Sequence, residues 1–232
     1  LSQREAAGPA DGAGMKPPLA LDKQPVIAAG PAEGYNSYAH SFAGMLCMFL
    51  LFLSQDMAKG LLEERRTGVL LRTRLARVRP IVPLVAMAGA TTVLGLILSA
   101  AVYAVGIVIF GIEVHGGALA LGAVLVAQAL FAGGFAVLLA GIGRSERQVQ
   151  AWGMAAILLM SFVGGAWYPR FMMPDWLQSV ATALPTSWAT EGLAAATWRG
   201  LPLSAALVPA LVLVCFAAAA TAIGAWRFRW EP

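Results

Sequence analysis

The segment LLEERRTGVLLRTRLARVRP, Leu61–Pro80, decides how this sequence is organised, because it concentrates charge in a chain that is otherwise poor in it. Its twenty residues hold two glutamates and six arginines, while only 12% of the 232 residues of the chain are charged. Soluble domains carry about twice that share. Placing one arginine at the centre of a bilayer costs about 3 kcal/mol. The segment therefore cannot cross a membrane, and we expect it at a membrane surface between spans.

Apolar runs on both sides of this segment are long enough to cross a bilayer. Four runs without Lys, Arg, Asp or Glu each contain at least the roughly 18–20 residues that a helix needs to span about 30 Å of hydrocarbon. A fifth run, Ser41–Ser54, has fourteen residues and reaches about 20 when it is extended to Tyr38 and Ala58. The sequence thus predicts an all-α polytopic membrane protein with five transmembrane helices. The expected spans are 38–58, 81–111, 117–142, 149–168 and 202–226.

Basic residues are distributed unequally between the two sides of these spans. Of the 16 lysines and arginines, eleven fall in connections on the side of Leu61–Pro80 and five fall on the other side. Basic residues near span ends stay in the cytoplasm. We therefore expect Leu61–Pro80 and the C-terminus inside the cell, and residues 1–37 outside it as a tail before a transmembrane domain over 38–232. This topology accounts for the net charge of +4, so we expect no nucleic-acid partner.

The charged segment also has the pattern of an amphipathic helix. Apolar positions recur in it at spacings of three, four and three residues, which places them on one face of a helix. These positions are Gly68, Leu71, Leu75 and Val78. Because a helix usually ends before a proline, we expect one basic helix over 61–79 at the cytoplasmic surface. Such a helix either fixes the topology and meets only lipid headgroups, or it docks on a partner.

The segment 169–200 has the composition of a hairpin at a membrane surface. Its prolines divide it into two short helical pieces, because proline interrupts a helix. Its tryptophans, with one just before it, reach the density that is typical of the headgroup region. The residues concerned are Trp167, Pro169, Pro174, Trp176, Pro185 and Trp188. We expect a re-entrant helical hairpin in the outer leaflet, and the alternative is a belt of interfacial aromatic residues without a further role.

Groups that could catalyse a reaction or bind a cofactor are sparse. Gln128 is the only strongly polar side chain far from an end of the long spans, whereas membrane enzymes and ion pumps need ionisable groups at depth. Glu113 and His115 could bind a metal or transfer protons, but two such residues on a turn are typical of a solvated surface. No G-x-x-x-x-G-K-[ST] phosphate loop occurs. We predict no catalytic, metal or cofactor site and no ATPase site in this chain.

Two sets of motifs resemble those of ABC-2 type transporter permeases, the transmembrane subunits of ABC exporters. Glu64-Arg65-Arg66-Thr67-Gly68, followed by leucines directly after a span, resembles the E-R-x-x-G-T-L coupling segment of the family. Three further motifs resemble its outer re-entrant hairpin: GGAWYP from Gly164, MPDWL from Met173 and LPTSW from Leu184. The resemblance covers about residues 35–228 and five of six expected helices. We therefore expect a C-terminal fragment that lacks the first transmembrane helix.

The resemblance implies a role for the charged segment. A permease of this family would pair with a second permease subunit, as a homodimer or heterodimer, and would bind an ATP-binding cassette subunit that binds and hydrolyses the ATP. The implied function is export of a hydrophobic or amphipathic substrate, of the drug, lipid or glycan type, across the inner membrane of a bacterium. The implied coupling residues are Glu64, Arg65, Arg66, Gly68, Leu71 and Leu75.

Two other classes of function remain open at this point. An accessory membrane protein could anchor a partner through the basic segment without moving a substrate. An intramembrane enzyme or a secondary transporter is disfavoured, because the spans lack ionisable residues.

Overall fold

The charge-free runs of the sequence form long helices, and shorter helices lie at their ends. The computed structural model describes residues 35–75, 79 and 81–228, without the side chains of Leu71 and Arg74, and these residues fall in one compact unit. Every element in this part of the chain is helical, which confirms the predicted all-α fold. The elements are α1 (Ser37–Arg66), α2 (Val69–Leu75), α3 (Ile81–Phe110), α4 (Ala118–Ile142), α5 (Glu146–Val163), η1 (Arg170–Met172), α6 (Asp175–Ala181), α7 (Pro185–Ala196) and α8 (Leu203–Arg227).

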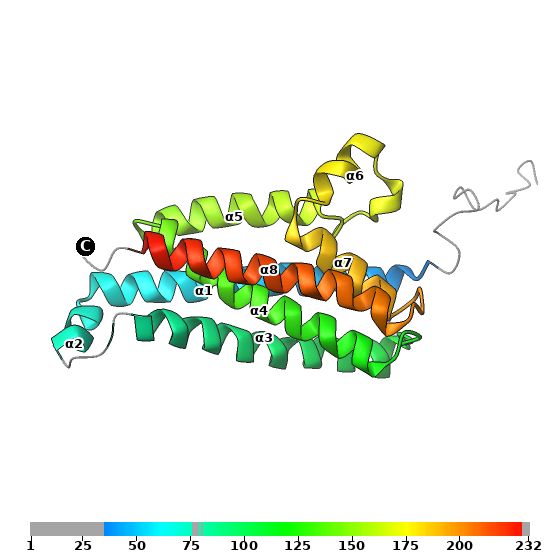
Figure 1. Ribbon diagram of the computed structural model, residues 1–232, viewed down its shortest axis with the longest axis horizontal. Coiled ribbons are helices and arrows are strands. Elements are labelled where there is room, and N and C mark those ends of the chain that lie inside the picture. The colour runs from blue at the N-terminus through cyan, green and yellow to red at the C-terminus, as the bar shows by residue number, and fades with distance from the viewer. Residues whose placement is uncertain (1–34, 76–78, 80, 229–232) are drawn as a thin grey trace, which may run out of the picture. The chain divides into compact units, whose positions relative to one another are not determined.

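Five long helices, α1, α3, α4, α5 and α8, lie side by side along one axis (Figure 1). Successive long helices reverse direction, so that α1, α4 and α8 run one way and α3 and α5 run the other. α4 packs against α1, α3, α7 and α8, and it is the most buried of the long apolar helices. We name the two ends of the bundle the α2 end and the α7 end, after the short helices that lie there.

Four of the described helices, α1, α3, α4 and α8, are long and apolar enough to cross a membrane. α1, expected as a span over 38–58, is in fact a helix of 30 residues. α5, expected as a span over 149–168, has 18 residues and ends at Val163. Its first turn contains Glu146 and Arg147, which lower its mean hydropathy. A fifth crossing by α5 therefore stays a prediction.

The single helix predicted over 61–79 is wrong. α1 continues from the span to Arg66, and a turn at Thr67 and Gly68 separates it from α2. The backbone N–H of Thr67 donates to the carbonyl of Glu63 at 2.8 Å, and Gly68 has a φ of +76°, which glycine adopts without steric cost. The glycine that was assigned to the apolar face is thus the residue that ends the helix.

Three parts of the sequence-based predictions lie outside the described residues. They are residues 1–34 of the expected outer tail, Val78 of the expected amphipathic face, and residues 229–232 at the expected cytoplasmic C-terminus.

The prolines of 169–200 divide this segment into three short helices, whereas two helical pieces were predicted. Pro169 precedes η1, Pro174 precedes α6, and Pro185 is the first residue of α7. Pro169 and Pro185 are buried, whereas Pro174 is exposed. α6 has seven residues, while α7 has twelve and packs against α1, α4 and α8. One half of the predicted hairpin is therefore an integral part of the bundle, and its position in the outer leaflet stays a prediction.

Small residues bring the backbones of α4 and α8 close together. Gly141 of α4 faces Gly224 of α8, and a Cβ atom at either position would overlap the backbone of the other helix. Gly134 of α4 faces the carbonyl of Ala217 in the same way. Lipid chains are as apolar as leucine, so close van der Waals packing of this kind holds membrane helices together.

Replacing Gly141 with alanine is expected to destabilise the bundle by about 1–3 kcal/mol, because the added methyl group forces α4 and α8 apart. Gly122→Ala is the matched control on the same helix, because a Cβ atom there meets no atom within 4 Å. This control also corrects for the better helix propensity of alanine. Denaturant unfolding in detergent micelles, followed by circular dichroism, measures the difference. Equal stability of the two variants would contradict the close approach of the helices.

Candidate functional site

The last two turns of α1 extend beyond the hydrocarbon. A helix of 30 residues is about 45 Å long, whereas the hydrocarbon of a bilayer is about 30 Å thick. Charge is concentrated at one end of α1, which marks the end that projects. We call residues 59–66 the α1 tip. Its charged residues are Lys59, Glu63, Glu64, Arg65 and Arg66.

Ion pairs order the side chains along the α1 tip. Arg66 donates two hydrogen bonds to the carboxylate of Glu63, at 2.9 and 2.8 Å. Lys59 Nζ lies 2.6 Å from Asp56 Oδ1, one turn earlier. The bonds from Arg66 lower the pKa of Glu63 to about 2, so this carboxylate is ionised at neutral pH. These ion pairs order the side chains. They contribute little to the stability of the fold, because water screens exposed charges.

The α1 tip is bonded to the start of α5. Arg65 Nη2 donates to the backbone carbonyl of Arg144, in the turn between α4 and α5, at 2.8 Å. Arg66 Nε lies 3.4 Å from Glu146 Oε1, in the first turn of α5. A hydrogen bond from the Glu146 carboxyl to Glu63 raises the pKa of Glu146. The two helices therefore form one connected unit at the α2 end, around a pocket of about 500 Å³.

Sequence analysis missed the contribution of the turn between α4 and α5. The one available signal was the short charged stretch 144–147, which lies on the same side of the spans as the α1 tip. Charge on a connection is equally consistent with a topology signal, so nothing in the sequence pairs Arg65 with Arg144.

The other predicted coupling residues belong to the last turn of α1, to the turn after it and to α2. The side chain of Glu64 is exposed, Gly68 forms the turn after α1, and Leu75 of α2 has 80% of its surface exposed. The backbone of Leu71 belongs to α2, and its side chain lies outside the described part of the structure. Leu70, which was not predicted, is the leucine of α2 that packs into the hydrophobic core.

The tryptophans of the predicted hairpin lie at the surface of the α7 end. Trp176 is 69% exposed. Trp167 is exposed as well, and its Nε1 donates to Met48 Sδ of α1 at 2.7 Å. Trp188 is partly buried, and its Nε1 donates to the carbonyl of Thr182 at 2.8 Å. An exposed indole ring with a bonded N–H group, as at Trp167, suits the boundary between lipid chains and water.

Two threonines of α7 bond this helix to the C-terminal end of α5. Thr186 Oγ1 donates to the carbonyl of Met160 at 2.6 Å, and Thr190 Oγ1 donates to the carbonyl of Gly164 at 3.2 Å. Sequence analysis did not identify these contacts. They connect α7 to the same helix whose opposite end is bonded to the α1 tip.

Polar groups in the middle of the bundle connect helices to one another. Gln128 Nε2 of α4 donates to Cys47 Sγ of α1 at 3.0 Å, and both side chains are buried. Ser54 Oγ of α1 donates to a backbone carbonyl of α4 at 2.8 Å.

Glu113 and His115, 2.9 Å apart, are exposed. Within the described residues, no three His, Cys, Asp or Glu side chains gather as a metal site requires.

Comparisons with known proteins identify the family. The family model of the ABC-2 type transporter matches residues 26–198, which is more than half of the chain. The linearmycin resistance permease protein LnrN of Bacillus subtilis (strain 168) is 28% identical over 197 residues, which are 81% of this chain and 48% of that protein. The chain thus spans about half the length of this curated relative. The resemblance seen in the sequence is confirmed, and this multi-pass membrane protein belongs to the ABC-2 type transporter family.

Proposed function

We propose that this chain is a permease subunit of an ATP-binding cassette exporter in the plasma membrane of a bacterium, and that its α1 tip receives force from a separate ATP-hydrolysing subunit. The contacts of Arg65 and Arg66 with the start of α5 carry this proposal. They join the projecting end of one long helix to the start of another. A push on the α1 tip therefore acts on two helices together.

The same contacts give the force a path to the opposite end of the bundle. α1 is one continuous helix of 30 residues, and it packs against α3, α4, α5 and α7. α5 leads from the α2 end to the threonine contacts with α7. Coupling between distant sites requires connected rigid elements of this kind. In this proposal, closure of the ATP-hydrolysing subunits tilts α1 and α5 and displaces α7.

The surface around the α1 tip suits a protein partner. Glu64 and Arg72 are exposed charges close to the turn at Gly68, and Leu75 is an exposed apolar side chain on α2. Protein interfaces combine an apolar centre with a polar rim in this way. We propose that these residues contact the ATP-hydrolysing subunit, while Arg65 and Arg66 hold the tip in place.

A second permease subunit belongs to this proposal. The pocket between α1, α4 and α7 that is lined by Cys47, Gln128 and Thr186 holds about 10 Å³, which is about the space that one water molecule needs. A substrate would not cross through it in this conformation. We therefore propose a path at the bundle surface, shared with a second copy or a related subunit.

The chemistry of the bundle and the name of a relative support the proposed substrate class. The outward faces of the long helices are apolar, which suits a hydrophobic or amphipathic substrate of the drug, lipid or glycan type. The name of LnrN connects that protein with resistance to linearmycin. The apolar outward faces and the name of this relative are both consistent with export of a toxic amphipathic compound.

Reversing two charges at the docking surface is expected to uncouple transport from ATP hydrolysis. In the full-length complex, Glu64→Lys with Arg72→Glu should lower substrate-stimulated ATPase activity by about tenfold or more, because like charges across an interface cost several kcal/mol. Glu113→Lys is the control, since Glu113 is also an exposed carboxylate but lies at the α7 end. ATPase assays in reconstituted vesicles, with and without substrate, provide the measurement.

The result of this experiment also separates a permease from a membrane anchor. An anchor would bind the ATP-hydrolysing subunit through the α1 tip. Vesicles that contain it would not move substrate, with or without the charge reversal. Unchanged transport after the charge reversal would contradict coupling through this tip.

The predicted topology has its own test in intact cells. A cysteine in place of Arg72 is expected to resist a membrane-impermeant maleimide until the cells are permeabilised, because the α2 end should face the cytoplasm. A cysteine in place of Glu113 should react at once. The background carries Cys215→Ala, because Cys215 is exposed, while Cys47 is buried. Immediate labelling at position 72 would reverse the assigned orientation.

A further inference from the structure

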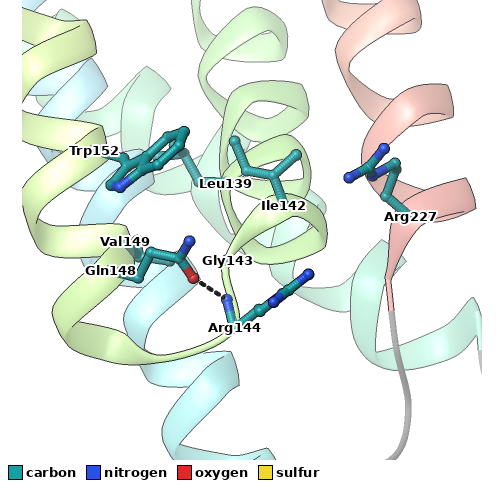
Figure 2. Close-up of a pocket in the computed structure, with 8 residues that line it drawn as sticks. All are labelled: Leu139, Ile142, Gly143, Arg144, Gln148, Val149, Trp152 and Arg227. Carbon is teal, nitrogen blue, oxygen red and sulfur yellow. Dashed lines mark hydrogen bonds between the residues drawn. The ribbon is translucent and has the colours of Figure 1, made fainter.

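A pocket of about 570 Å³ lies at the α2 end, between the turn that follows α4, the first turns of α5, and the last turn of α8 (Figure 2). It is separate from the pocket beside the α1 tip, although Arg144 lines both. Neither the predicted coupling residues nor the outer hairpin line it.

Two arginines border this pocket from different elements. Arg144 extends from the turn after α4, and Arg227 extends from the end of α8. Figure 2 shows their guanidinium groups turned toward one another across the space between the two elements. Both side chains are exposed, and among the described residues neither guanidinium has a carboxylate partner, unlike those of Arg66 and Arg199. Within the described residues, the rim therefore carries two positive charges without a carboxylate partner.

An amide group adds a hydrogen-bond donor to the rim. Gln148 Oε1 accepts a hydrogen bond from the backbone N–H of Arg144 at 2.8 Å (Figure 2). This bond fixes the orientation of the amide and leaves its NH₂ group to donate to a ligand. Guanidinium groups bind phosphate oxygens through paired, charge-assisted hydrogen bonds. The rim thus matches the chemistry of a phosphate group.

The wall of the pocket is apolar and extends from the α2 end along α4 and α5. It is formed by Leu139 and Ile142 of α4 and by Val149 and Trp152 of α5. Trp152 lies six residues after Glu146, which corresponds to about 9 Å along the helix. Ile142 and Trp152 are exposed, so the wall offers apolar surface to a ligand.

We infer that this pocket binds one anionic phospholipid, with its phosphate between Arg144 and Arg227 and an acyl chain against Ile142 and Trp152. A basic rim above an apolar wall at the end of membrane helices matches the two parts of such a lipid. Free phosphate would leave the wall uncovered. A water-soluble protein partner could pair with the arginines, but it would not reach the wall below the headgroup level.

The test uses the full-length protein in detergent, titrated with phosphatidylglycerol or phosphatidylcholine and analysed by native mass spectrometry. Tighter binding of phosphatidylglycerol is expected in the unmodified protein. Arg144→Gln and Arg227→Gln should each weaken it about fivefold, and the double variant about 30-fold, since one basic residue near a membrane surface contributes a factor of this size. Arg144→Lys with Arg227→Lys should retain most of the binding, which excludes misfolding as the cause.

A matched control removes the same charge at the same end of the bundle. Arg72→Gln with Arg147→Gln should leave phosphatidylglycerol binding within about twofold of the unmodified protein, because neither residue lines this pocket. Equal losses in the control and in the double variant would overturn the proposal, since they would show attraction by net charge alone.

Three further outcomes would also overturn it. Equal affinity for phosphatidylcholine would show that the arginines do not select an anionic lipid. Displacement of phosphatidylglycerol by glycerol 3-phosphate at comparable concentration would indicate a site for free phosphate. Unchanged lipid binding in the double variant, together with loss of a co-purifying ATP-hydrolysing subunit, would assign the arginines to a protein interface. Retained preference for phosphatidylglycerol in the presence of glycerol 3-phosphate supports the lipid.

Discussion

The cost of charge in hydrocarbon is the constraint on which this structure depends. It keeps the uncharged part of α1 within the membrane and forces the residues that begin at Lys59 to project beyond it. Because α1 is about 15 Å longer than the hydrocarbon is thick, its charged end continues as a helix rather than as a loop. The glycine at position 68, with its positive φ, ends α1 and separates it from α2.

Inside the membrane, a second constraint replaces the hydrophobic effect. Helices there associate through close contact and through hydrogen bonds, because lipid competes for any apolar surface. α4 meets both requirements: its glycines admit the backbone of α8, and its Gln128 side chain bonds to α1. A central helix held on several sides therefore fixes the arrangement of α1, α3, α7 and α8 around it.

The features that could be predicted from the sequence depend on local chemistry. Apolar length identified the long helices, and Pro169, Pro174 and Pro185 marked where the segment 169–200 divides. The predicted helix over 61–79 failed because spacing assigned Gly68 to a helical face, whereas its backbone takes a conformation that ends a helix. The bond between Arg65 and the Arg144 carbonyl could not be predicted, because it joins residues 79 positions apart and appears only when α1 and α5 pack together.

Arg144 connects the two sites at the α2 end. Its backbone carbonyl accepts the hydrogen bond from Arg65, and its side chain borders the pocket that we assign to an anionic lipid. If movement of the α1 tip shifts this turn, the lipid meets a different spacing between Arg144 and Arg227. Linkage then requires reciprocity. A lipid that binds more tightly when the turn is in one position stabilises the matching position of α1 by the same free energy. In the proposed mechanism, the lipid composition around the protein would thus act on the same α1 tip as the ATP-hydrolysing subunit, from the membrane side.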